Sequence, residues 1–445
     1  MRRGEGGMNA PVHPPVAPPE VDAGPGPGGA VRLLRRLMFD PVGMIEDFQR
    51  RHGQVFTIPV PFGLTPPFTF LTTRQGYGAV LNLPPTVGKN GPIIDRVPAL
   101  ATWTPRSDAS AEHLQTLLLT GRRFIGARLR ERSPKELEGI VRRGARRHMA
   151  RWMGTVDLAE VMVAAIHDIS ARVLLGDDLW EALGEDAPAL VRTVVNAVDA
   201  ARAAVALSPA ARLLPEHRAT KELSKRFMTL ANDPAADRFS FVAGLRRLDR
   251  DGERFPPEDL AWMMFFALWN ATLYTGTYGL WSFLDWVDHP DLAALVTDPS
   301  PERGDLLVGG ALETMRLNPI SWQLRALASP VTVQSEGRSY RVPAGHFLSV
   351  FSHGLNREAA TYPDPLAWRP RRYVEGAPMP LLFGTGPFSC VAQRWVKLLI
   401  ATLHEEIFDR FTVSLCAPLP RRQSRVHLLY PNEPVLARVR RRDSS

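Results

Sequence analysis

The sequence predicts a mainly helical fold of the α+β class, with a few small β-sheets. A long helix is expected from about Pro257 to Asp288, and a second helical run extends from Val391 to Phe411. Between them, Val331–Val333 and Tyr340–Gly345 have the composition of short strands. Hydrophobic residues make up 45% of the 445 positions, and no internal repeat or low-complexity linker divides the chain. We therefore expect one domain with a large core over residues 31–441.

The first thirty residues are rich in proline and glycine, which predicts a disordered tail over residues 1–30. No apolar run is long enough to span a membrane, because polar residues interrupt the most apolar stretch, Ala261 to Trp286. No apolar segment of a signal peptide follows Arg2-Arg3. We therefore expect a cytoplasmic protein with no membrane partner. The only two cysteines, Cys390 and Cys416, exclude a disulfide framework.

Arginines are dense between Arg122 and Arg151, and the formal net charge of the chain is +8. A solvated helix face explains such a run most simply. No nucleic-acid recognition motif accompanies the charge, so nucleic acid is not an expected partner.

The segment from Phe383 to Cys390 carries the most chemical information. Gly384 and Gly386 leave room for a large flat ligand near the backbone and permit unusual backbone angles. Cys390 precedes a helix, where amide donors and the helix dipole are expected to favour a thiolate. A thiolate held in this way suits an axial position of haem iron. The alternative is a structural cysteine in a glycine-rich turn.

A second motif is Glu313-Thr314-Met315-Arg316, whose acid and base share one helical face. Together with Phe383, Gly384, Gly386 and Cys390, and with the segment Trp368–Tyr373, it resembles the cytochrome P450 family, in particular its soluble bacterial branch. The resemblance covers roughly Val31 to Arg441. It implies a triangular helical prism with small β-sheets, and haem b buried between the long central helix and the cysteine loop. It also implies a buried structural triad of Glu313, Arg316 and Arg372.

Two positions of the cysteine loop depart from the family pattern. Phe388 stands where the family has a basic residue that contacts a haem propionate, and Ala392 replaces a glycine. Either another side chain holds that propionate, or the propionate remains in contact with water. The resemblance assigns two further residues to the propionates, namely His113 and Arg325.

The long helix departs further from the family, whose proton relay pairs an acid with an alcohol. Counting back from His289-Pro290 places Leu273 at the acid and Tyr274 at the alcohol, and a shift of one residue would bring in Thr275. Asn270 lies one turn before Tyr274 on the same stripe of the helix. We take Asn270, Tyr274 and Thr275 as the candidate catalytic residues.

This altered helix resembles that of the atypical members prostacyclin synthase and allene oxide synthase, which rearrange or dehydrate substrates that already contain an oxygen–oxygen bond. It predicts an enzyme that cleaves a heteroatom–oxygen bond in a lipophilic small molecule, in secondary metabolism. The first alternative is a monooxygenase that depends on ferredoxin and a ferredoxin reductase and takes protons from substrate or water. The second is a non-catalytic partner protein, which the retention of Cys390 argues against. The expected substrate pocket is apolar or aromatic, and its candidate residues are Trp103, Ala267, Ala271, Ile320 and Trp322.

Overall fold

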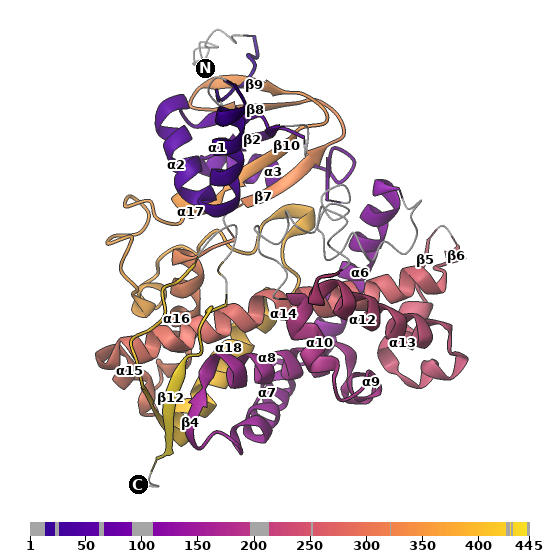
Figure 1. Ribbon diagram of the computed structural model, residues 1–445, viewed down its shortest axis with the longest axis vertical. Helices are drawn as coiled ribbons and strands as arrows, with labels where there is room; N and C mark the ends of the chain where they lie inside the picture. The colour runs from indigo at the N-terminus through magenta and orange to yellow at the C-terminus, as the bar shows by residue number, and fades with distance from the viewer. Residues whose placement is uncertain are drawn as a thin grey trace, which may run out of the picture. The chain divides into compact units, whose positions relative to one another are not determined.

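The computed structural model describes residues 14–22, 26–61, 66–90, 110–195, 213–250, 252–320, 322–423, 428 and 430–442. The chain forms two compact units. The smaller unit combines residues up to Lys89 with Trp322–Leu355 and Thr385–Phe388, and the larger unit holds the rest. Figure 1 draws both with the labels used below. Each unit is described by itself.

The smaller unit is built on a five-stranded sheet in the order β1-β2-β10-β7-β3. Strand β10 pairs parallel with β2, and the other neighbours are antiparallel. All five residues of β10 are buried, which is expected of a central strand. The elements of this unit are α1 (Gly26–Phe39), α2 (Pro41–His52), β1 (Val55–Ile58), β2 (Phe68–Leu71), α3 (Arg74–Leu81), β3 (Gly88–Lys89), β7 (Trp322–Leu327), β8 (Val331–Ser335), β9 (Arg338–Val342), β10 (Phe347–Phe351), α17 (Ser352–Leu355) and the short helix η5 (Gly386–Phe388).

Part of the segment expected to be a disordered tail has regular contacts. The amide of Val16 donates to the carbonyl oxygen of Ser339 at 3.0 Å, and the amide of Arg341 donates to Val16 at 2.8 Å. The amide of Val21 donates to Thr57 at 2.8 Å, and α1 begins at Gly26. Prolines favour an extended backbone, and in this segment the extended backbone pairs with the edges of strands. Composition alone did not predict this pairing. Residues 1–13 lie outside the described part.

The larger unit is mainly helical, and α14 (Pro257–Asp288) runs through it alongside α8 (Leu158–Leu175) (Figure 1). Helix α14 is buried on nearly all sides, which is characteristic of the central helix of a large core. The other helices are α6 (Ala111–Glu131), α7 (Pro134–Met149), α9 (Asp177–Ala182), α10 (Ala187–Val195), α12 (Pro215–Asn232), η3 (Pro234–Arg238), α13 (Ser240–Arg246), α15 (Pro290–Thr297), α16 (Arg303–Leu317), η4 (Pro370–Tyr373) and α18 (Gln393–Arg410).

Short strands complete the larger unit. A three-stranded antiparallel sheet has the order β11-β12-β4, and β5 pairs with β6 in a hairpin. These strands are β4 (Gly154–Asp157), β5 (Asp249–Arg250), β6 (Glu253–Arg254), β11 (Phe411–Leu415) and β12 (Leu436–Arg441). Among the described residues, no helix has both the length and the apolar character needed to cross a bilayer. The predicted class, mainly helical with small sheets, is confirmed.

Candidate functional site

The loop from Phe383 to Cys390 has the backbone that its glycines predict. Gly384 and Gly386 adopt φ angles of 65° and 66°, in the left-handed region that glycine tolerates best. A Cβ on Gly386 would also approach the carbonyl oxygen of Leu81 to 2.8 Å, so this glycine is required by packing within the smaller unit. In the larger unit, the amide of Cys390 donates to the carbonyl oxygen of Phe383 at 2.7 Å. The loop is therefore a defined turn before α18.

The Cys390 side chain is exposed, but the protein around its sulfur still raises the pKa of the thiol. The backbone amides of Ala392 and Gln393 and the charge of Arg122 lower the same pKa, without reversing the shift. The amide donors at the helix start thus favour the thiolate, as expected, but in the free side chain desolvation outweighs them. A metal ion deprotonates a coordinating thiol by its own charge, so ligation at Cys390 does not depend on that shift.

Behind the cysteine loop, in the larger unit, the structure brings together the predicted triad. Glu313 and Arg316 are fully buried and form a two-pronged ion pair, with Nε–Oε1 at 2.6 Å and Nη2–Oε2 at 2.9 Å. Arg372 reaches Glu313 Oε2 at 3.4 Å, and the Tyr373 hydroxyl donates to Glu313 Oε1 at 3.0 Å. Arg316 also donates to the carbonyl oxygen of Asn356. Donors from four residues, counting the Arg369 amide at 3.0 Å, surround this one carboxylate and offset the cost of burying its charge.

Arg325 lies on β7 in the smaller unit and is only 5% exposed. Its guanidinium carbon is 4.5 Å from the centre of the Phe388 ring, and its Nη1 donates to the carbonyl oxygen of Leu324 at 2.8 Å. The residue predicted to hold a propionate is thus in contact with the cysteine loop, at the position where that loop departs from the family.

His113 lies near the start of α6 in the larger unit. Its Nε2 is 2.8 Å from Oδ1 of Asp259, a carboxylate on α14 that is 1% exposed. The buried carboxylate of Asp259 requires a hydrogen-bond donor, which explains why the His113 ring lies against α14. The structure therefore assigns Nε2 of His113 to a contact between helices, and its predicted role at a propionate stays a prediction.

The middle of α14 presents one partly exposed face, formed by Phe266, Asn270, Ala271 and Tyr274. Asn270 is exposed, and its Nδ2 donates to the carbonyl oxygen of Phe266 at 2.8 Å, so the side chain folds back along the helix. Burial raises the pKa of Tyr274 to about 12, so its phenol stays protonated at neutral pH. Thr275 is 2% exposed, and its hydroxyl donates to the carbonyl oxygen of Ala271.

Comparison with known proteins agrees with this arrangement. A family model described as Cytochrome P450 matches residues 312–437, which include the triad and the cysteine loop. An obtusifoliol 14-alpha demethylase of Sorghum bicolor is 24% identical over 91% of this chain and 86% of its own length. A flavonoid 3'-monooxygenase of Oryza sativa subsp. japonica is 28% identical over 36% of this chain and 35% of its own length. The mitochondrial Cytochrome P450 11B1 of Rattus norvegicus is 31% identical over 27% of this chain and 24% of its own length.

The family model over residues 312–437 and these relatives support a cytochrome P450. The chain is a haem-thiolate oxidoreductase, and its cofactor is haem b. The residues present fit that cofactor: Cys390 offers a thiolate ligand before a helix, two glycines open the loop, and Arg325 reaches the loop as a cation. The flavonoid 3'-monooxygenase and Cytochrome P450 11B1 align over only about a quarter to a third of their own lengths.

The residues predicted to contact the substrate of this P450 differ in burial, and not all of them are described by the structure. Trp103 lies outside the described residues, and Trp322 lies on β7 with a side chain that is not described. Ala267 is 2% exposed, so it belongs to the core of α14. Ala271 and Ile320 are half-buried in the larger unit, where they remain candidates for contact with a substrate.

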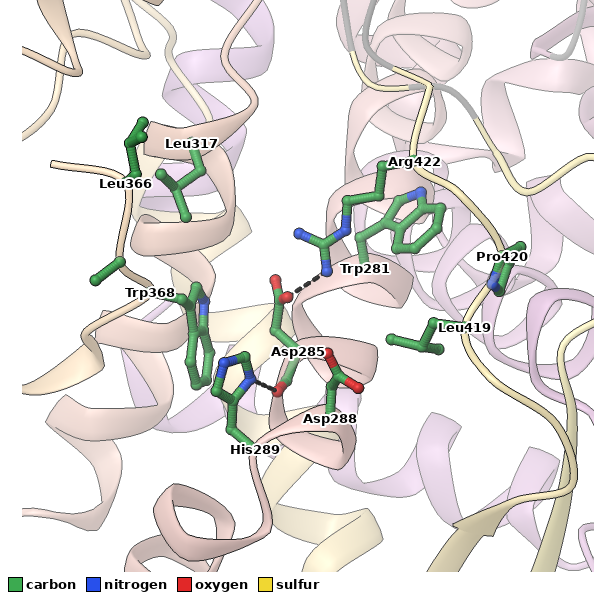
Figure 2. A pocket seen from close by; sticks show the side chains of 11 residues that line it. Trp281, Asp285, Asp288, His289, Leu317, Leu366, Trp368, Leu419, Pro420 and Arg422 are labelled. Carbon is green, nitrogen blue, oxygen red and sulfur yellow. Dashed lines mark hydrogen bonds and ion pairs between the residues drawn. The ribbon is translucent and has the colours of Figure 1, made fainter.

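A separate cavity of about 610 Å³ lies at the C-terminal end of α14 and contains none of the predicted site residues. Figure 2 shows Arg422 and Asp285 directed toward one another in it, with the His289 ring bonded to the backbone oxygen of Asp285. Burial raises the pKa of Asp285, an effect that Arg422 opposes. Fifteen residues of helix separate Asp285 from Asn270, or roughly 22 Å, so this cavity is distinct from the partly exposed face of α14 that carries the candidate catalytic residues.

Sequence reasoning missed two groups near these sites. Arg122 on α6 acts electrostatically on Cys390, whereas the arginine-dense segment that contains it is predicted to form a solvated helix face. Beside α14, His167 Nε2 lies 3.2 Å from the Tyr430 hydroxyl, and burial lowers the pKa of His167 to about 4. The density of arginines between Arg122 and Arg151 was the sequence signal for the first group, Arg122. No local pattern marks the second, because 263 residues separate the two partners.

Proposed function

We propose that this P450 acts on a lipophilic small molecule that already contains a weak heteroatom–oxygen bond, in cytoplasmic secondary metabolism. The products would arise by rearrangement, cyclisation or dehydration. The observation that carries the proposal is the absence of any charged residue in α14 from Leu260 to Leu284. A proton relay to bound dioxygen needs an acid on this helix, and the sequence offers none in its middle.

The geometry of the hydroxyls on α14 supports the same conclusion. Thr272 is fully buried, and its hydroxyl donates to the carbonyl oxygen of Leu268 at 2.8 Å. The Thr275 hydroxyl is likewise directed at its own helix. Leu273, which the register places at the acid, is 1% exposed in the core, where a carboxylate would be costly to bury. Neither of these two threonine hydroxyls nor a carboxylate is thus presented on the exposed face.

Asn270 and Tyr274 remain on that face and define what the chain can do there. Asn270 uses one N–H on Phe266, and its amide oxygen and second N–H can orient an oxygen of the substrate. With a pKa of about 12, Tyr274 can donate a hydrogen bond to a developing oxyanion but cannot serve as a base near neutral pH. When bound, haem with a thiolate ligand supplies the electron donation that favours cleavage of an oxygen-containing bond.

A monooxygenase is the second candidate, and the relatives favour it. Two of them are named as a demethylase and a flavonoid 3'-monooxygenase. In that case substrate hydroxyls or ordered water would supply protons, and ferredoxin with its reductase would supply electrons. The exposed Arg143 and Arg147 on α7 would suit an acidic electron donor.

Turnover without any redox partner separates the two candidates. Haem-loaded protein would be incubated with lipophilic hydroperoxides and with N–O compounds, without reductant, and the products followed by mass spectrometry. We expect isomerised or dehydrated products under these conditions. The matched control is the corresponding alcohol or amine, which should be inert. Strict dependence on NAD(P)H, ferredoxin and reductase would refute the first candidate and establish the second.

A further inference from the structure

The cavity at the C-terminal end of α14 has more negative than positive charge in its lining. Its volume of about 610 Å³ is typical of small-molecule sites, and all of the residues that line it belong to the larger unit. The lining contains two carboxylates, Asp285 and Asp288, but only one arginine, Arg422 (Figure 2). The two carboxylates lie three residues apart on one face of α14, and the carbonyl end of the helix dipole adds to their negative potential. A ligand in this cavity therefore meets an excess of negative charge.

Arg422 is already paired within the cavity. Its Nη2 donates to Oδ1 of Asp285, whose Oδ2 accepts from the Thr314 hydroxyl at 2.5 Å. Burial still raises the pKa of Asp285, so these two donors compensate its charge incompletely. Asp288 is exposed, and no described residue forms a hydrogen bond or an ion pair with its carboxylate. The unmatched negative charge of the cavity is thus that of Asp288.

One aromatic wall of the cavity already holds a cation. The guanidinium carbon of Arg422 lies 4.8 Å from the centre of the Trp281 ring, and Trp281 is fully buried. An aromatic face attracts a cation through the quadrupole of its ring, and tryptophan does so most strongly. The cavity therefore offers an organic cation both a carboxylate and an aromatic face.

Trp368 and His289 form a second aromatic wall. Nε1 of Trp368 donates to the Thr314 hydroxyl at 3.2 Å, and the centres of the Trp368 and His289 rings are 5.1 Å apart. Nδ1 of His289 lies 2.8 Å from the carbonyl oxygen of Asp285 and carries the proton of the neutral ring, because a carbonyl oxygen only accepts. Nε2 of the neutral ring is then an acceptor. These contacts fix the wall before a ligand binds, which lowers the entropy that binding costs.

We propose that this cavity is a binding site for an organic monocation, namely an ammonium group with apolar substituents. The charge lies near Asp288 and the tryptophan faces, and the substituents contact Leu317, Leu366 and Leu419. Leu366 is 70% exposed, so a ligand at this edge covers an apolar side chain that is otherwise in water. The inference goes beyond the function proposed above and does not depend on it, because roughly 22 Å of helix separates the cavity from Asn270.

Two other kinds of ligand fit the cavity less well. A metal ion lacks ligands, since no group of three or more histidine, cysteine, aspartate or glutamate side chains in the described part of the chain is arranged to hold one. An anion could use the remaining N–H donors of Arg422, but it would lie close to both carboxylates. A cation and an anion therefore predict opposite responses when one of these charges is removed.

The test measures binding of benzyltrimethylammonium to the full-length, haem-loaded protein by isothermal titration calorimetry. This probe has no lone pair on its nitrogen, so it cannot ligate haem iron, and the Soret band recorded in parallel should not shift. Phenylacetate serves as the probe of opposite charge. The variants are Asp288→Asn, the matched control Asp291→Asn, and Arg422→Gln. Asp291 is an exposed carboxylate three residues beyond Asp288 that does not line the cavity.

We expect Asp288→Asn to weaken binding of benzyltrimethylammonium by about 3- to 10-fold, the effect of one charge at about 4 Å in water. Asp291→Asn should change it by less than about 2-fold, because its exposed charge is screened from the cavity. Arg422→Gln should strengthen binding, since it removes the cation that competes for Asp285 and for the Trp281 face. Phenylacetate should bind the wild type more weakly than benzyltrimethylammonium.

Absence of binding by the wild type, or equal binding by the wild type and Asp288→Asn, would overturn the inference. A Soret shift on binding would overturn it as well, because it would place the probe at the haem. Tighter binding of phenylacetate, strengthened further by Asp288→Asn, would overturn it in favour of an anion site. Asp288 and Asp291 are both exposed, so this pair of variants decides the question even where Arg422→Gln does not fold. None of these readouts requires turnover, so a failure of the function proposed above leaves them unchanged.

Discussion

Two regions of the larger unit treat charge in opposite ways. Around Glu313, a fully buried carboxylate is surrounded by Arg316, Arg372 and Tyr373, and its donors are accounted for. The middle of α14, from Leu260 to Leu284, contains no charged residue at all. The first region holds a scaffold in place, and the second carries the candidate catalytic residues Asn270 and Tyr274. Under the function proposed above, this P450 keeps the charged framework of its family and changes the chemistry that the framework supports.

A second charged cluster belongs to the same framework. Glu406 on α18 is 1% exposed and accepts from Arg146 of α7 at 2.9 Å, from Arg142 at 2.9 Å and from Arg410 at 3.0 Å. It ties the helix that follows Cys390 to α7. Burial by itself would raise the pKa of Glu406, but the three arginines bring it down to about 2.

The largest effect should come from breaking the buried triad. Arg372→Ala removes one of the cations that stabilise Glu313 and leaves a carboxylate that is 0% exposed with fewer partners. We expect the free energy of unfolding to fall by about 3–5 kcal/mol, as measured by urea denaturation. The matched control is the adjacent Arg371→Ala, which breaks an exposed pair with Glu302 and should cost less than about 1 kcal/mol. Equal losses for the two variants would remove the contrast between framework and surface.

The second prediction concerns pH and Glu406. Its pKa in the folded protein, about 2, is below the ordinary value of 4.5, so its contribution is complete above pH 4.5 and is lost as the pH falls toward 2. The shift corresponds to about 3 kcal/mol of unfolding free energy at pH 7. Glu406→Gln should therefore be less stable than wild type at pH 7 by about that amount, and the gap should close toward pH 2.

The control for this prediction is Glu138→Gln. Glu138 pairs with Arg142 at 2.6 Å, but its side chain is 40% exposed, so its loss should be small at every pH. Urea denaturation of the three proteins between pH 7 and pH 3 provides the measurement. A gap between wild type and Glu406→Gln that is independent of pH would mean that Glu406 stabilises α18 by packing rather than by charge.

The framework could be predicted from sequence because its signals are local or belong to a well-defined pattern. Glu313 and Arg316 are three residues apart on one helix, and Arg372 follows a proline in a short aromatic and basic segment. Cys390 is flagged by two glycines that adopt the expected left-handed backbone. Such features depend on neighbours in the chain, so one sequence is enough to find them.

The reaction face could be predicted only in part, because its decisive contacts join distant residues. Nothing near His113 indicates that its ring reaches Asp259, 146 positions away. Helical periodicity placed Asn270 and Tyr274 on one stripe, but it could not show that Asn270 is exposed and bonded to Phe266. Likewise, the contact between Arg325 and Phe388 depends on which strand of the sheet adjoins the loop.

The smallest effect on stability, and the sharpest test of the comparison, belongs to Asn270. Because Asn270 is exposed, Asn270→Ala should change the free energy of unfolding by less than about 0.5 kcal/mol. If its amide stabilises a leaving oxygen, turnover of a hydroperoxide should still fall by about 100-fold in single-turnover measurements. Unchanged turnover would make Asn270 a surface residue of α14 and nothing more.

Asn270→Asp extends this test, since it keeps the shape of the side chain and restores an acid to the charge-free stretch of α14. An enzyme that consumes pre-oxygenated substrates should gain nothing from it, because a carboxylate repels the oxyanion that the amide would stabilise. A monooxygenase that lacks its acid should instead show faster product formation with reductant and dioxygen. Whether Asn270→Asp raises or lowers the rate therefore separates an α14 face suited to a different reaction from one that has only lost a proton donor.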